Sequence, residues 1–188
     1  MEIHVIEPRC LYAVKYDNEK FNEFDRIFEH HGDLNRVLHF FESYKNLISD
    51  YYVEKLKFPR HETEAYANYV IHEIEILSEY FDDLIDNTIN LETPDLRGHF
   101  KILEGFEQHD MPVLKSYGLC SPSMVRVYAI EIDKQSLIIF YSGIKIRKSI
   151  SECPDLKDNV IQKARKVIDF LRDEGVIDAD DIDNLTQK

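Results

Sequence analysis

The chain has 188 residues, of which 44% are hydrophobic and 12% aromatic, so it can bury a core and is not a disordered chain. No apolar run approaches the roughly 18 residues that a membrane-spanning helix needs, and the first residues lack the basic and apolar regions of a signal peptide. The cysteines, Cys10, Cys120 and Cys153, fit no metal-ligand spacing. These features together predict a cytoplasmic protein with free thiols that does not enter a membrane.

The formal net charge of −13 argues against a nucleic-acid partner, but the charge is unevenly distributed. Residues 17–96 contain 19 acidic and 7 basic residues, and residues 173–188 contain 6 acidic and 1 basic. Residues 97–172 contain 9 acidic and 13 basic residues. One basic segment therefore lies between two acidic ones.

The first half of the chain predicts a strand followed by helices. Residues 3–6 and 11–14 favour β structure, and Pro8 between them indicates one bent or bulged strand. Apolar residues then recur at helical spacing from about residue 17 to residue 31. Gly32 ends this first helix.

Two further helices are expected before residue 96. Asp33 is a suitable N-cap for a helix that ends before Pro59, because the residue ahead of a proline avoids the helical region. Thr63 can cap a third helix with an apolar stripe up to Ile85 and acidic residues largely on its other face. A helical hairpin would let these stripes cover one another.

After Pro94 the pattern becomes that of β structure. Short strands are expected within residues 99–106 and 113–117, and a longer pair at residues 125–132 and 137–144, joined by a turn at residues 133–135. The second strand of that pair is too apolar for an exposed edge and is expected to be central. A basic segment at residues 145–149 follows, then a helix from about residue 155 to residue 174, which Gly175 ends.

Common catalytic motifs are absent from the sequence. There is no phosphate-binding glycine loop and no Gly-x-Ser-x-Gly elbow. His30 and His31 lie beside Asp33, but adjacent histidines at a helix end point in different directions, so they do not indicate a metal site. We therefore expect no metal and no cofactor.

The basic segment carries the chemical signal. In an antiparallel pair, Arg126 at the start of one strand lies near the end of the other, where Lys145, Arg147 and Lys148 follow. Such a group can neutralise phosphates and stabilise the charge that builds up during RNA cleavage. The same residues would also suit a solvated face of an ordinary sheet, and the pattern alone leaves both interpretations open. Further basic residues would extend the patch: Lys101, Lys163, and Arg165 or Lys166.

The order of these elements resembles the RelE/ParE superfamily of type II toxins, especially its HigB-like branch. The resemblance rests on residues 97–172. It is carried by Lys101-Ile-Leu, Met124-Val-Arg-Val-Tyr, Leu137-Ile-Ile-Phe-Tyr-Ser-Gly-Ile-Lys-Ile-Arg-Lys-Ser and Ile161-Gln-Lys-Ala-Arg-Lys-Val-Ile-Asp-Phe. Family members look similar in having an arginine on the penultimate core strand, a lysine-rich turn after the last strand, and a helix beyond it.

The resemblance implies an α+β fold: a RelE-like antiparallel sheet with a long N-terminal helical hairpin insertion and a C-terminal helix. Residues 1–188 would form a single RelE-like domain, with an enlarged acidic helical insertion at residues 17–96 and a basic sheet-helix core at residues 97–174. The implied function is that of a toxin-like mRNA-cleaving endoribonuclease that acts on free mRNA or on the ribosome and is neutralised by a small antitoxin protein.

The resemblance also assigns residues to roles. It implies that Arg126, Lys145 and Lys148 are catalytic, and that the residues binding RNA are Lys101, Arg147, Lys163 and Arg165. The motif places no general base; Tyr128 and Tyr141 are the nearest candidates and are equally suited to be packed aromatics.

Two alternatives belong to other functional classes. The same scaffold would suit a non-catalytic binding module, either a degenerate toxin or a gyrase-directed inhibitor, and the acidic helices would suit a structural or regulatory protein that binds a partner. The acidic insertion or tail would also suit a built-in brake that covers the basic patch, or simply a solubilising face.

Overall fold

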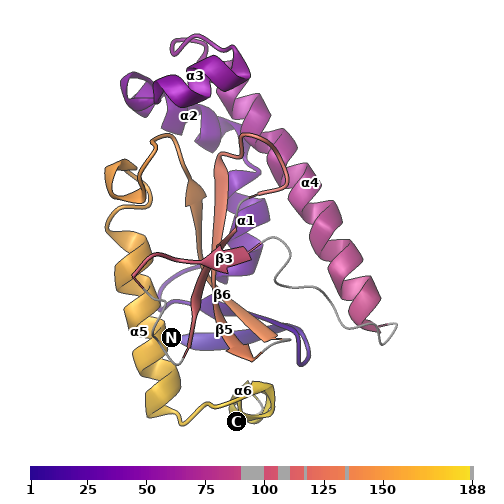
Figure 1. Cartoon of the computed structure of the whole chain (residues 1–188). Coiled ribbons are helices and arrows are strands. Elements are labelled where there is room, and N and C mark those ends of the chain that lie inside the picture. Colours follow the sequence, from indigo (N-terminus) through magenta and orange to yellow (C-terminus); the bar gives the residue numbers. More distant parts are fainter. Residues whose placement is uncertain (90–99, 106–110, 117, 134–135, 187–188) are drawn as a thin grey trace.

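The computed structural model describes residues 1–89, 100–105, 111–116, 118–133 and 136–186. These residues form one six-stranded sheet with helices packed on both faces (Figure 1). The predicted fold class, α+β, is therefore confirmed. His99, Phe106, Tyr117 and residues 134–135 of the turn predicted at residues 133–135 lie outside the described residues.

The sheet is mixed. Its strands are β1 (Glu2–Glu7), β2 (Leu11–Lys15), β3 (Phe100–Ile102), β4 (Val113–Ser116), β5 (Val125–Asp133) and β6 (Ser136–Ile144). Their order across the sheet is β1-β2-β6-β5-β4-β3. β2 runs parallel to β6, whereas the other neighbouring pairs are antiparallel. The prediction of an antiparallel sheet is therefore wrong at the β2–β6 pair, which joins strands from opposite halves of the sequence.

The N-terminal segment forms a hairpin rather than the single bent strand predicted. β1 and β2 pair antiparallel, and Pro8 lies in the turn between them. The amide of Cys10 donates to the carbonyl of Glu7 at 3.1 Å, and Arg9 adopts a left-handed φ of 63°. A proline breaks the ladder of a strand, and here the chain reverses at that break.

Four helices precede the central strands. They are α1 (Glu23–His31), α2 (Leu34–Tyr44), α3 (Asp50–Leu56) and α4 (Thr63–Ile89). Asp33 caps α2, as predicted: its side chain accepts from the amides of Asn35 and Arg36. The predicted helix that ends before Pro59 is interrupted by a 3₁₀ turn at Lys45–Leu47, after which the buried Ile48 takes a non-helical conformation. The predicted second helix is therefore two helices, α2 and α3, and α2 packs against α4, as the helical hairpin predicted.

These helices cover one face of the sheet. Alternate residues of the strands pack on them, among them Leu11 and Ala13 of β2 and Val125, Val127 and Ala129 of β5. β6 is buried along its whole length, which confirms that it is central.

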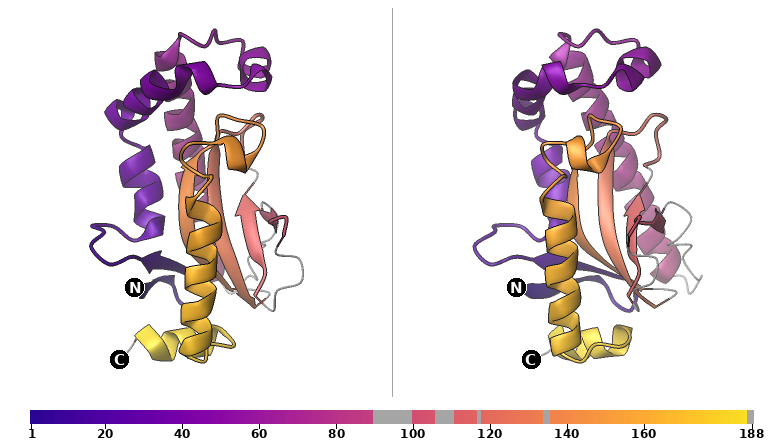
Figure 2. Two further views of the ribbon diagram at one scale, coloured as in Figure 1. Left: turned by 90° about the vertical axis from the view of Figure 1, so that its left-hand side faces the viewer. Right: turned by 60° about the vertical axis from the view of Figure 1, so that its left-hand side comes forward.

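Two helices lie on the opposite face, α5 (Asn159–Asp173) and α6 (Ala179–Thr186) (Figure 2). The buried residues of α5 recur at helical spacing and pack on the strands: Val160, Ala164, Val167, Ile168 and Leu171. Gly175, at a φ of 72°, follows α5 as predicted, whereas α6 was not predicted. α6 lies at the bottom of Figure 1, at the opposite end of the sheet from the segment that joins β6 to α5.

Candidate functional site

The register of β5 and β6 brings the predicted basic residues together. Arg126 pairs with Gly143, and the amide of Lys145 donates to the carbonyl of Met124 at 2.7 Å. Arg126 and Lys145 therefore leave neighbouring strands at the same end of the sheet, as the antiparallel pairing predicted. Together with Lys148 they line a pocket of about 390 Å³, which we call the basic pocket.

The basic pocket is built from three parts of the chain. Residues of β4 and β5 and the segment after β3 form one side, the segment after β6 forms another, and the start of α5 with the residues before it closes the third. Its lining residues are Leu103, Glu104, Lys115, Ser116, Arg126, Tyr128, Lys145, Lys148, Ser149, Ile150, Ser151, Lys157 and Ile161. Among the described residues, this lining has five cations and one carboxylate, a composition that favours an anionic ligand.

The backbone beneath Arg126 is held by the helical segment. Glu73 of α4 is buried, and its Oε2 accepts from the amides of Met124 at 2.8 Å and Val125 at 2.9 Å. Burial raises the pKa of Glu73, while the two amide hydrogen bonds and the charge of Arg126 oppose this rise. The long acidic helix therefore fixes the point at which β5 begins.

The guanidinium of Arg126 is itself fixed by hydrogen bonds. Its Nη1 donates to Ser123 Oγ at 2.8 Å and to the carbonyl of Val125 at 2.7 Å. The hydroxyl of Tyr52, from α3, donates to the Ser123 carbonyl at 3.1 Å. These contacts use only part of the donor capacity of the guanidinium, which carries five N–H groups. Arg126 is thus oriented in advance and keeps donors for a ligand.

Lys145 is partly withdrawn from solvent. Burial lowers its pKa, and the positive charges of Arg126 and Lys115 lower it further, against the opposing effects of Cys153 and Glu104. A lysine in such surroundings exchanges its proton more readily than an exposed one, and groups of this kind concentrate at functional sites.

The two tyrosines considered as general bases lie in different surroundings. Tyr128 and Tyr141 are opposite each other on β5 and β6. The hydroxyl of Tyr141 donates to the carbonyl of Asp155 at 2.8 Å, and the residue does not line the basic pocket. Tyr128 does line it, and its buried hydroxyl has no hydrogen-bond partner among the described residues.

The predicted RNA-binding residues lie outside the basic pocket. Lys101 is exposed on β3, opposite Lys115. Arg147 lies 3.4 Å from Glu152 and donates to the carbonyl of Leu47 at 3.3 Å. Arg165 is exposed on α5.

The side chain of Lys163 forms an ion pair and a cation–π contact within the protein. Its Nζ donates to Glu23 Oε1 at 2.7 Å and lies 4.1 Å from the centroid of the Tyr16 ring. Glu23 is buried at the start of α1, so this ion pair joins the helices on the two faces of the sheet.

The sequence prediction missed two cations of the pocket, Lys115 and Lys157. Lys115 pairs with Tyr128 across β4 and β5. The two residues before it, Val113 and Leu114, are both buried, so no alternation of apolar and polar residues indicated which face Lys115 occupies. Lys157 reaches the pocket because α5 packs on the sheet. Both placements depend on long-range contacts.

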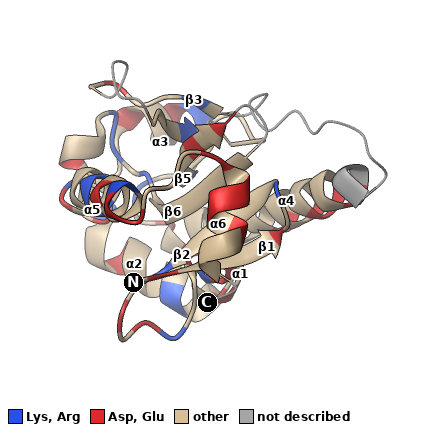
Figure 3. Cartoon of the chain, turned by 90° about the horizontal axis from the view of Figure 1, so that it is seen from below, with Lys and Arg blue, Asp and Glu red and all other residues tan. Residues whose placement is uncertain are grey.

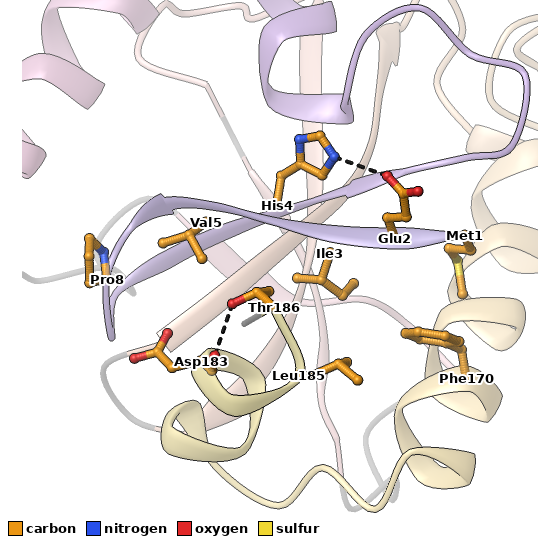
Figure 4. Close-up of a pocket in the computed structure, with 10 residues that line it drawn as sticks. All are labelled: Met1, Glu2, Ile3, His4, Val5, Pro8, Phe170, Asp183, Leu185 and Thr186. Carbon is orange, nitrogen blue, oxygen red and sulfur yellow. Dashed lines mark hydrogen bonds and ion pairs between the residues drawn. The ribbon is translucent and has the colours of Figure 1, made fainter. Parts of the chain in front are cut away.

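A larger groove of about 800 Å³ runs between β1 and the ends of α5 and α6 (Figure 4). Its lining is mainly apolar: Met1, Ile3, Val5, Pro8, Phe170 and Leu185, with Glu2, His4, Asp183 and Thr186. Among the described residues it is lined by no lysine or arginine. His4 lies 3.5 Å from Glu2. Without a convergent set of polar groups aimed inward, this groove is a weaker candidate for chemistry than the basic pocket.

The histidines considered as metal ligands serve other contacts. His31 is buried with its Nε2 3.1 Å from Ser142 Oγ, and burial lowers its pKa to about 3. His30 lies 2.8 Å from Arg36. The described residues contain no group of three His, Cys, Asp or Glu side chains placed to hold a metal ion. In the same residues, no helix is long and apolar enough to cross a membrane.

Comparisons of the chain with protein-family models, curated proteins and solved structures find no match. The resemblance to RelE/ParE toxins therefore stays a prediction from the sequence pattern, and the function has to be argued from the basic pocket.

Proposed function

We propose that the protein binds the backbone of RNA in the basic pocket and cleaves it, as a toxin-like endoribonuclease. The observation that carries this proposal is the convergence of Arg126, Lys145 and Lys148 on one pocket. These are the three residues to which the family resemblance gives catalytic roles. RNA cleavage without a metal needs cationic donors where negative charge builds up on the phosphate, and the pocket supplies them.

Each of the three residues has a distinct proposed part. The 2′ hydroxyl of the RNA passes its proton to a solvent water as its oxygen attacks the adjacent phosphorus, which forms a 2′,3′-cyclic phosphate and breaks the bond from phosphorus to the 5′ oxygen of the next nucleotide. Arg126, held by Ser123 and Val125, stabilises the added negative charge on the non-bridging oxygens. Lys145, whose pKa is lowered by burial, gives its proton to the departing 5′ oxygen. Lys148, exposed at the pocket rim, binds a neighbouring phosphate.

The proposed cellular setting follows the family resemblance. The protein would act in the cytoplasm on mRNA, free or on the ribosome, and a small antitoxin protein would neutralise it. The pocket, with a volume of about 390 Å³, accommodates a short segment of the RNA backbone.

The test is induction of the full chain in cells, with mapping of transcript 5′ ends and measurement of growth. We expect new 5′ ends and growth arrest. In the double variant Arg126→Ala, Lys148→Ala both should disappear, because loss of one preorganised donor already costs roughly 10²- to 10³-fold in rate.

The matched control is Lys101→Ala, Arg165→Ala. This variant also removes one lysine and one arginine charge, but from exposed positions outside the pocket. Cells that express it should still show new 5′ ends. Growth arrest without new ends but with DNA damage would contradict the proposal and support a gyrase-directed inhibitor. Absence of any growth effect and of new ends would contradict it in favour of a binding or structural protein.

A further inference from the structure

Tyr128 carries a hydroxyl that the folded chain does not use. The side chain is fully buried on the α5 face of the sheet, with its ring 6.3 Å from that of Phe140 and 6.4 Å from that of Tyr141. It lines the basic pocket, and its hydroxyl has no hydrogen-bond partner among the described residues. Buried hydroxyls are nearly always hydrogen-bonded, so an unpartnered one requires an explanation.

Packing alone does not explain this tyrosine. A phenylalanine would fill the same space with the same ring and would avoid the cost of a buried, unsatisfied polar group. The opposite residue, Tyr141, shows the usual arrangement, because its hydroxyl donates to Asp155. The two tyrosines thus share a strand pair and a degree of burial but differ in whether the hydroxyl is satisfied.

The surroundings determine what the Tyr128 hydroxyl can do. Burial raises its pKa, and the nearby charge of Arg126 only partly opposes this, so the group stays protonated at physiological pH. It is therefore a hydrogen-bond donor and not the general base. The pocket that it lines carries Lys115, Arg126 and Lys145, which attract anions.

We propose that the hydroxyl of Tyr128 donates a hydrogen bond to a non-bridging oxygen of a phosphate group bound in the basic pocket. The inference rests on the proposed function and deepens it, because it identifies a residue on β5 that binds a phosphate of the RNA backbone in the basic pocket. A neutral donor beside three cations matches a tetrahedral phosphate, which presents several oxygens in different directions.

The test compares Tyr128→Phe with the matched variant Tyr141→Phe. Both variants remove one hydroxyl from facing positions of the same strand pair. The probes are inorganic pyrophosphate and a ten-nucleotide single-stranded RNA, titrated at fixed pH and salt by calorimetry, and stability is measured by urea unfolding.

We expect a crossed result. Tyr128→Phe should be as stable as the wild type or more stable, and should bind both probes roughly tenfold or more weakly, since a hydrogen bond to a charged group is lost. Tyr141→Phe should be less stable, because Asp155 loses its donor, and should bind both probes within about twofold of the wild type.

The other outcomes are decisive as well. If Tyr128→Phe binds both probes like the wild type, or loses as much stability as Tyr141→Phe, the inference is overturned. In that case a loss of RNA cleavage in the Arg126→Ala, Lys148→Ala variant would still support the proposed function. If Tyr128→Phe weakens binding but the wild type cleaves no RNA, the proposed phosphate contact of Tyr128 is supported and the proposed RNA cleavage is contradicted. A wild type that binds neither probe overturns both.

Discussion

Lys163 was predicted to bind RNA, yet its charge lies against a buried carboxylate. Its side chain is 22% exposed and that of Glu23 only 3%. Removing Lys163 takes away one charged hydrogen bond but leaves the carboxylate with Arg26, whose Nη1 lies 3.2 Å from both Glu23 oxygens. Lys163→Ala should therefore lower the free energy of unfolding by about 2 kcal/mol, measured by urea denaturation. Arg165→Ala, two positions further along the same helix and exposed, should change it by less than about 0.5 kcal/mol.

The same pair of variants tests the predicted RNA-binding role. Because neither residue lines the basic pocket, both variants should bind a short single-stranded RNA like the wild type under conditions where they remain folded. Weakened RNA binding by Lys163→Ala without a loss of stability would instead show that Lys163 leaves Glu23 to contact the ligand.

At the scale of residues, the sequence could predict what local register determines. Arg126 and Lys145 meet because two strands joined by a short connection pair antiparallel, and that pairing follows from the pattern of residues 125–144. The contact of Lys163 with Glu23 was not predicted, because the two residues are 140 residues apart in the chain. Helical periodicity places residue 163 next to the buried face of its helix. It does not indicate which element from the other face of the sheet contacts that residue.

At the scale of elements, long periodic segments were predictable and long-range pairings were not. α4 and α5 follow apolar stripes at helical spacing, and the strength of that signal grows with length. The β1–β2 hairpin was missed because its turn uses Pro8 and Arg9, with a left-handed arginine where glycine or asparagine is typical. The parallel β2–β6 pair joins residues 11–13 to residues 137–139, a contact that leaves no local pattern.

The acidic tail is a structural element and does not cover the basic pocket. Val176, Ala179 and Ile182 are buried against the sheet, and none of the tail residues that the structure describes, 176–186, lines the pocket. Asp183 accepts from the Tyr12 hydroxyl at 2.9 Å, and Asp180 pairs with Arg9 at 2.6 Å. Seen from below, α6 presents acidic residues at the end of the sheet that carries the chain termini (Figure 3).

Deletion of residues 176–188 should therefore act through packing. We expect a loss of about 3 to 5 kcal/mol in the free energy of unfolding, since two large side chains and one small one leave the core. RNA affinity of the folded fraction at roughly 150 mM salt should be unchanged, because exposed charges beyond the Debye length are screened.

A full-length control separates charge from packing. Asp180→Asn, Asp183→Asn removes two acidic charges and keeps the apolar face of α6, so it should retain most of the stability. If instead the deletion increased RNA cleavage or growth arrest at equal protein levels, the tail would be a brake on the pocket, and the packing account would be wrong.

At the scale of the whole molecule, a net charge of −13 surrounds a pocket that is locally positive. A protein that binds RNA over a broad basic surface neutralises many phosphates and releases many counterions from the RNA. A protein that binds the RNA backbone in a single pocket neutralises few phosphates and releases few counterions. A cavity of about 390 Å³ suits one or two phosphates. Lys101, Lys163 and Arg165 lie outside it and should add nothing to the count.

The salt dependence of RNA binding should consequently be shallow. For two phosphate contacts on a single strand, the slope of log K against log salt should be about −1.4. Arg126→Ala should reduce its magnitude by about 0.7, and Lys101→Ala should leave it unchanged. Fluorescence anisotropy of a labelled ten-nucleotide RNA between 50 and 300 mM KCl measures all three. A slope steeper than about −3 would mean that at least four phosphates are contacted, more than the pocket can hold, and would restore the extended patch that the sequence first indicated.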